Sequence, residues 1–129
     1  MSALVATVLA MLVLDGLWLG LVARGFYRQH LGFLMADQVN WGAAGLFYTL
    51  YAIGLTVFVT MPSIDGGSVG TALWRGALFG LVAYATYDLT NQATLKGWPV
   101  IVTAVDLAWG MLLSAAVGAI ATYAVLRIS

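Results

Sequence analysis

Three aspartates, Asp15, Asp88 and Asp106, stand inside long apolar stretches of this chain. On insertion scales an aspartate at the centre of a membrane helix costs about 2.5–3.5 kcal/mol. Residues of this kind usually face the interior of a helix bundle, where they mark a binding site or a path for ions. The chemistry open to three such acids is the binding of a cation, the transfer of a proton, or general acid–base catalysis.

The composition places these acids in a membrane. Hydrophobic residues make up 63% of the chain and charged residues 8%, whereas about a quarter of the residues of a soluble domain are charged. The net charge of zero gives no indication of nucleic acid as a partner. The chain has no cysteine and one histidine, which excludes disulfides, thiolate metal sites and multi-histidine metal sites. We therefore expect an integral membrane protein without a metal or a cofactor.

Four apolar stretches are long enough to cross the membrane, which takes about 20 helical residues. They cover residues 3–23, 39–61, 72–95 and 100–126. We interpret residues 62–71 as a loop because of their turn formers, and residues 24–38 as either a short amphipathic surface helix or an ordinary loop. The sequence thus predicts one domain over residues 1–129, an all-α polytopic membrane protein folded as a four-transmembrane-helix bundle.

The three acids lie at similar distances from the ends of their predicted spans. Each stands eight or nine residues inside the side that carries the first and third connections. At about 1.5 Å per residue this depth is about 12–14 Å. We therefore expect the three carboxyl groups to share one layer, with at most one or two of them ionised at neutral pH because neighbouring carboxylates repel each other.

Helical spacing adds neighbours to this layer. Tyr84 and Asn91 stand at i−4 and i+3 from Asp88 and share its face, and Tyr48 of the second span lies at the same depth. Trp18 and Trp109 each follow an aspartate by three residues on spans of opposite direction, so we expect them on opposite sides of the acid layer. The predicted intramembrane binding site comprises Asp15, Trp18, Tyr48, Tyr84, Asp88, Asn91, Asp106 and Trp109. The alternative is that the acids are hydrogen-bonding groups that only hold the helices together.

Small residues recur at helical spacing on three of the spans, which is typical of close helix packing. The stripes are Gly16 and Gly20, then Gly76 and Gly80, then Gly110, Ser114 and Gly118. They either pack within one bundle or form a homodimer interface.

Aromatic and basic residues near the span ends suggest contact with the membrane surface. We interpret Trp41, Trp74 and Trp98 as aromatic-belt anchors and expect the Arg75 side chain to extend toward the surface.

Several motifs together resemble a known family. They are DGLWLG from residue 15, FYRQHLGFLM from residue 26, YDLTNQATLKGWP from residue 87 and VDLAWG from residue 105. The chain resembles, over nearly its whole length, a family of small bacterial membrane proteins described as a domain of unknown function (DUF2177). The resemblance implies a four-helix, multi-pass protein of the bacterial inner membrane, and it implies no activity.

Three functions are compatible with these observations. The first is a protein that binds or transports a proton, a cation or a small amphiphile, with membrane lipid and a lipophilic or cationic small molecule as its partners. The second is a membrane enzyme that acts on a lipid or isoprenoid, with two acids as general acid and base. The third is an accessory subunit of a membrane complex.

Overall fold

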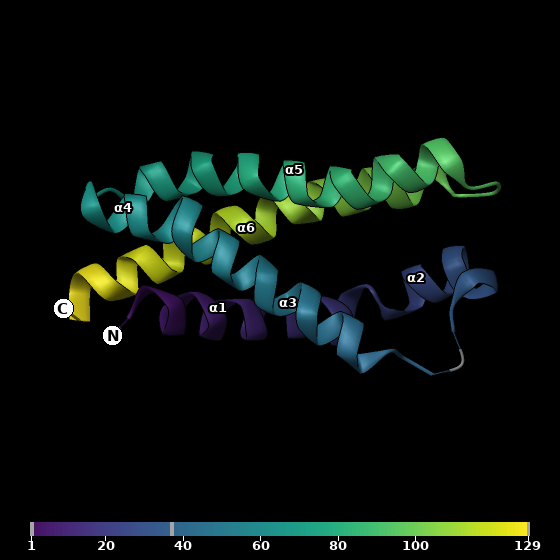
Figure 1. Ribbon diagram of the computed structural model, residues 1–129, viewed down its shortest axis with the longest axis horizontal. Coiled ribbons are helices and arrows are strands. Elements are labelled where there is room, and N and C mark those ends of the chain that lie inside the picture. Colours follow the sequence, from purple (N-terminus) through teal and green to yellow (C-terminus); the bar gives the residue numbers. More distant parts are fainter. Residues whose placement is uncertain (1, 37, 129) are drawn as a thin grey trace.

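The computed structural model describes residues 2–36 and 38–128, and helices joined by short connections make up most of them (Figure 1). Two of the helices run on into π-helical turns, Trp18–Val22 and Thr56–Thr60, and a 3-10 turn, Gly32–Leu34, follows α2. The α-helices are α1 (Ala3–Leu17), α2 (Arg24–Leu31), α3 (Trp41–Leu55), α4 (Met61–Asp65), α5 (Val69–Thr94) and α6 (Val100–Ile128). The predicted all-α class is confirmed, and a helix is present in the first connection, where α2 covers Arg24–Leu31; its position on the membrane surface stays a prediction.

Within the described residues, three continuous helical segments are long and apolar enough to cross a membrane: Ala3–Val22, Trp41–Asp65 and Val100–Ile128. The 26-residue helix α5 is long enough as well, but it is less apolar. Either Arg75 or Asp88 falls in every stretch of 18 residues within α5, and each lowers the hydropathy of the stretch that contains it. Apolar spans are therefore confirmed, whereas the length and composition of α5 alone do not mark it as a fourth.

The second span is longer than predicted, and the loop that follows it is shorter. The helix continues from α3 through the π-helical turn into α4, so that residues 66–68 alone separate it from α5. Pro62 is tolerated because it lies in the first turn of α4, although its missing N–H leaves the carbonyl group of Phe58 without its helical donor. Arg75 Nε donates a hydrogen bond to that carbonyl oxygen at 2.7 Å. Arg75 thus bonds to the neighbouring helix, which the sequence did not predict.

Helices α5 and α6 form an antiparallel hairpin with the most extensive contact between any two described elements (Figure 1). Glycines make this contact possible: a Cβ atom on Gly76 would lie 2.6 Å from Ala115 Cα, and one on Gly80 would overlap the carbonyl group of Gly110. The stripes of α5 and α6 therefore pack on each other within the chain. A Cβ atom on Gly16 or Gly20 would meet nothing within 4 Å, so the stripe of α1 is free of such contacts.

The tightest packing lies in the half of the molecule that carries both termini. Met11, Leu55 and Val117 are fully buried there, and Thr7 and Thr60 share a hydrogen bond of 2.9 Å between α1 and the second span. Toward the other end, α3 crosses away from α5 to lie beside α1 (Figure 1). The candidate site lies in this second half.

Candidate functional site

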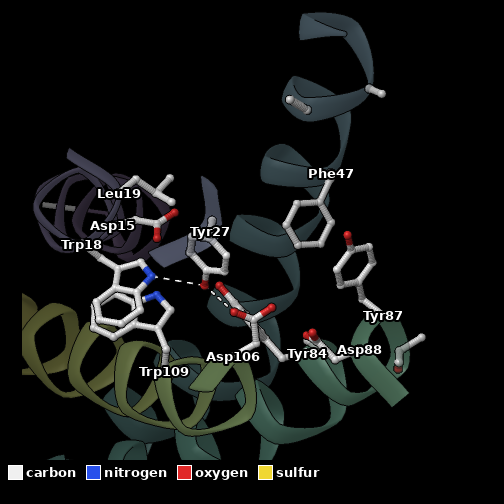
Figure 2. Close-up of a pocket in the computed structure, with 14 residues that line it drawn as sticks. Asp15, Trp18, Leu19, Tyr27, Phe47, Tyr84, Tyr87, Asp88, Asp106 and Trp109 are labelled. Atoms are coloured by element: carbon white, nitrogen blue, oxygen red, sulfur yellow. Dashed lines mark hydrogen bonds between the residues drawn. The ribbon is translucent and has the colours of Figure 1, made fainter. Parts of the chain in front are cut away.

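A cavity of about 750 Å³ lies between α1, α2, α3, α5 and α6. Figure 2 shows its lining side chains. Six of the eight predicted site residues line it: Asp15, Trp18, Tyr84, Asp88, Asp106 and Trp109. The other lining residues are Leu19, Tyr27, Ala43, Ala44, Phe47, Ala83, Thr86 and Tyr87. The three acids therefore meet one cavity, and most of its remaining wall is apolar or aromatic.

Asp88 is the most unusual group in this cavity. Its side chain is 0% exposed, and neither carboxyl oxygen has a hydrogen-bond partner among the described residues. The carboxyl group of Asp106, which is 7% exposed, lies next to it. A buried polar group without a partner costs about 1–3 kcal/mol. A proton shared with the neighbouring Asp106 carboxyl group offsets part of this cost, so the two acids act as one pair.

Asp106 differs from Asp88 because it has a partner. The hydroxyl group of Tyr27 donates a hydrogen bond to Asp106 Oδ1 and accepts one from Trp18 Nε1 at 3.4 Å (Figure 2). Burial, and secondarily the bond to Asp106, raises the pKa of the Tyr27 hydroxyl above its usual range, so that Tyr27 stays a neutral donor at physiological pH. Tyr27 lies in α2, outside the predicted spans, and is not among the predicted site residues. The aromatic pair Phe26–Tyr27 directly after the first span was the available signal.

The two tryptophans stack on each other, which contradicts the prediction that they lie on opposite sides of the acids. Their ring centroids are 4.4 Å apart and their planes differ by 11°. Because each tryptophan follows its aspartate by three residues on antiparallel helices, stacking at one height shifts Asp15 and Asp106 apart by about 9 Å along the helix axes.

The single acid layer is therefore wrong in detail. Asp88 and Asp106 form a pair, while Asp15 lies apart from them, beside the indole of Trp109 and the hydroxyl group of Tyr48. The prediction of equal depth failed because it assumed that all spans end at the same height. In the structure the contact of Gly80 with Gly110 fixes the register of α6 against α5, and the chain continues past the end of α1 through a π-helical turn.

The family model for predicted membrane proteins of the type DUF2177 matches residues 1–123. The chain belongs to this family. No curated protein and no solved structure matches the chain. Every cavity residue of this DUF2177 member falls within the matched range. The family description confirms the membrane character of the protein and leaves its chemistry to be argued from the cavity.

Two predicted site residues lie outside the cavity lining. Tyr48 contacts Asp15 through its hydroxyl group and does not line the cavity. Asn91 lies beside Tyr87, one turn beyond the Asp88 level of α5. The predicted face of Tyr84, Asp88 and Asn91 thus reaches the cavity through its first two members alone.

The polar end of α5 has a structural role next to the cavity. Gln92 donates to the Trp98 carbonyl group at 3.0 Å, Trp98 Nε1 donates to Thr103 at 3.0 Å, and the Thr103 hydroxyl donates to Gln92 Oε1 at 2.9 Å. This closed set of hydrogen bonds joins α5 to α6 across their hairpin. Trp98 is 6% exposed, so its interpretation as a surface anchor was wrong. Hydrogen bonds therefore hold together the two helices, α5 and α6, that carry Asp88 and Asp106.

The cavity is suited to a ligand that has a positive or hydrogen-donating group and an apolar body. The carboxyl pair supplies the negative end, and the aromatic side chains of the lining supply the apolar wall. In the part of the chain that the structure describes, no three His, Asp, Glu or Cys side chains are close enough to hold a metal ion.

Proposed function

We propose that this protein binds a small amphiphilic cation inside the membrane and exchanges it for a proton. The observation that carries this proposal is the buried pair of carboxyl groups of Asp88 and Asp106 in an otherwise apolar cavity. Because two neighbouring carboxyl groups in a low-dielectric interior do not both ionise, the empty pair holds a proton. An arriving cation replaces that proton, which couples binding to proton release.

The size and the walls of the cavity support a small organic ligand. Its volume of about 750 Å³ falls within the range of about 300–1,000 Å³ that is common for ligand pockets. Trp18 and Trp109 present stacked indoles, and Tyr84 adds a third aromatic wall. Aromatic faces attract cations and accommodate apolar groups, which matches an amphiphile better than a hydrated inorganic ion.

The outer wall of the cavity gives the ligand a way in from the bilayer. Leu19, Phe47 and Tyr87 line the cavity and are also 53%, 54% and 58% exposed. Apolar surface that is exposed in a membrane protein contacts lipid chains, so an amphiphile dissolved in the bilayer reaches the cavity sideways, between α3 and its neighbours.

The same proposal includes four membrane crossings in a bacterial inner membrane, with α5 as the additional span. The 26 residues of α5 extend about 39 Å as a helix, more than the ~30 Å hydrocarbon core. Of its two charged side chains, Asp88 is buried inside the protein, and Arg75 bonds through its Nε to the Phe58 carbonyl group. Its extensive contact with the apolar helix α6 supports the same placement.

A titration of the purified protein in weakly buffered detergent with tetraphenylphosphonium tests the proposal. We expect saturable binding with the release of about one proton per cation. Asp88→Asn should lose the proton release and weaken binding at least about tenfold, because it removes the acid that the cation neutralises. The matched control is Asp65→Asn, since Asp65 is an exposed aspartate at the end of α4, and it should titrate like the original chain. Binding that is equal in Asp88→Asn, Asp106→Asn and the original chain would rule the proposal out.

One observation favours an enzyme as a second candidate. The two neighbouring acids differ in their surroundings, because Asp106 accepts a hydrogen bond from Tyr27 and Asp88 accepts none from a described residue. Such asymmetry is what a general acid and a general base require. Comparing the lipids of cells that carry the original gene with those of cells that carry the Asp88→Asn gene decides this point: a lipid that accumulates only in the variant supports an enzyme, and identical extracts exclude one acting on abundant lipids.

A further inference from the structure

A second hollow, of about 410 Å³, lies on the outer face of the molecule between the second span and α5. Its lining consists of Phe58, Trp74, Arg75, Leu78, Phe79 and Val82, and we call it the Arg75 groove. It shares no lining residue with the acidic cavity. Five of its six side chains are aromatic or aliphatic, and the sixth is a cation.

The position of Arg75 is fixed by two contacts. Its Nε donates to the Phe58 carbonyl oxygen at 2.7 Å, and its guanidinium carbon lies 5.4 Å from the centroid of the Trp74 ring. The two terminal nitrogens, with four N–H groups between them, make no hydrogen bond to any residue that the structure describes. A guanidinium fork held in this way is preorganised for a phosphate or carboxylate group.

The missing N–H of Pro62 explains why the Nε–H of Arg75 bonds to the Phe58 carbonyl group. It gives no role to the four N–H groups on the terminal nitrogens. A single donor would be enough for the Phe58 carbonyl, and a neutral side chain could supply it. The charge and the remaining four N–H groups therefore need a separate reason. A cation in an apolar groove on a membrane helix is best neutralised by an anion that carries apolar chains.

We propose that the Arg75 groove binds an anionic phospholipid. The phosphate group lies on the terminal nitrogens of Arg75, and an acyl chain lies along Phe58, Phe79 and Val82. Charge complementarity indicates the headgroup, since the groove offers a cation and no acid. The exposed apolar walls indicate the chain, because Phe58 and Val82 are both 58% exposed to the surroundings that lipid would occupy. This site is independent of the acidic cavity and of the proposed cation exchange.

Native mass spectrometry of the full chain in detergent tests this site, with phosphatidylglycerol and phosphatidylcholine as probes. We expect the original protein to prefer phosphatidylglycerol and Arg75→Gln to lose about tenfold of that preference. Arg127→Gln is the matched control, because Arg127 also lies over an aromatic ring, at 5.3 Å from that of Tyr123, but lines neither hollow. An excess of inorganic phosphate should leave phosphatidylglycerol bound. Displacement by phosphate would show a site for free anions and overturn the lipid assignment.

Two further variants keep the test decisive if Arg75→Gln folds poorly. In the double variant Pro62→Ala with Arg75→Gln, residue 62 regains an N–H. The Phe58 carbonyl group then has a helical donor while the charge of residue 75 is absent. Val82→Trp fills the groove and leaves Arg75 in place. Both should lose the preference for phosphatidylglycerol. If either folded variant keeps the full preference of the original chain, the proposal is wrong.

Discussion

Asp88 and Asp106 are neighbours on adjacent helices, yet they have opposite relations to their surroundings. Asp106 accepts a hydrogen bond from Tyr27, while the buried oxygens of Asp88 have no partner among the described residues. The first arrangement stabilises the fold, and the second places a buried carboxyl group with only the other acid beside it among the groups that shift its titration. In the proposed function, this acid is the one that the ligand neutralises.

This difference predicts stability changes of opposite sign. Asp88→Leu should raise the free energy of unfolding by about 1–3 kcal/mol, because it removes an unpartnered buried polar group and places an apolar one beside a cavity. Asp106→Leu should lower it by about 1–3 kcal/mol, because Tyr27 loses its acceptor. Thermal unfolding of both variants in the same detergent measures the two shifts. Equal destabilisation by both substitutions would mean that Asp88 has a structural partner.

The sequence was informative about which residues line the cavity and less so about their hydrogen-bond and stacking partners. Three acids inside apolar stretches, with tryptophans at helical spacing, were enough to predict six of the residues that line the cavity. The aromatic pair Phe26–Tyr27 marked a candidate, but the contact of Tyr27 with Asp106 could not be predicted, because the direction in which α2 leaves the first span depends on tertiary packing. The stacking of Trp18 on Trp109 depends on helix register, which span lengths do not specify.

The glycine stripes decide how the helices are placed against one another. Gly76 and Gly80 bring α5 so close to α6 that a methyl group would meet backbone atoms, whereas Gly16 and Gly20 of α1 face open space. Of the two predicted roles of the stripes, packing within the chain is therefore correct for α5 and α6. A homodimer through small residues stays a prediction. Gly16 and Gly20 of α1 are the pair of glycines that could form it, since they make no close contact within the chain.

Substituting the two kinds of glycine should have different effects. Gly80→Ala should destabilise the protein by about 1–3 kcal/mol, because the new methyl group overlaps the Gly110 carbonyl group and forces α5 and α6 apart. Gly16→Ala should be neutral or stabilise the protein by up to about 1 kcal/mol, since alanine favours the helix and meets no other atom. Thermal unfolding compares them directly, and a similar loss in both would show that α1 packs against something at Gly16.

The boundaries of the elements were predicted well where a local signal exists. The hairpin between α5 and α6 follows from Gly97, whose φ of 74° favours glycine, and from Pro99 just before α6. The end of the second span was misplaced, because Pro62 is compatible with the first turn of a new helical segment and its cost is offset by Arg75 on another helix. No pattern within residues 62–71 could show that distant donor.

At the scale of the whole molecule, the proposed four crossings place the two ends of α5 on opposite sides of the membrane. The absence of cysteine makes this easy to measure. Asp65→Cys and Lys96→Cys put single thiols on exposed residues next to either end of α5. In sealed vesicles of one orientation, a membrane-impermeant maleimide should label one variant and not the other. Labelling of both from the same side would contradict the crossing by α5.

The wider molecule combines a tightly packed half with a half that holds the cavity, and the account depends on a ligand occupying that cavity at Asp88. The most direct measurement is an experimental structure of the protein with bound tetraphenylphosphonium. We predict density for the cation between the stacked tryptophans and the Asp88–Asp106 pair. A structure with the cation elsewhere, or with Asp88 bonded to a residue other than Asp106 in place of the ligand, would contradict the account.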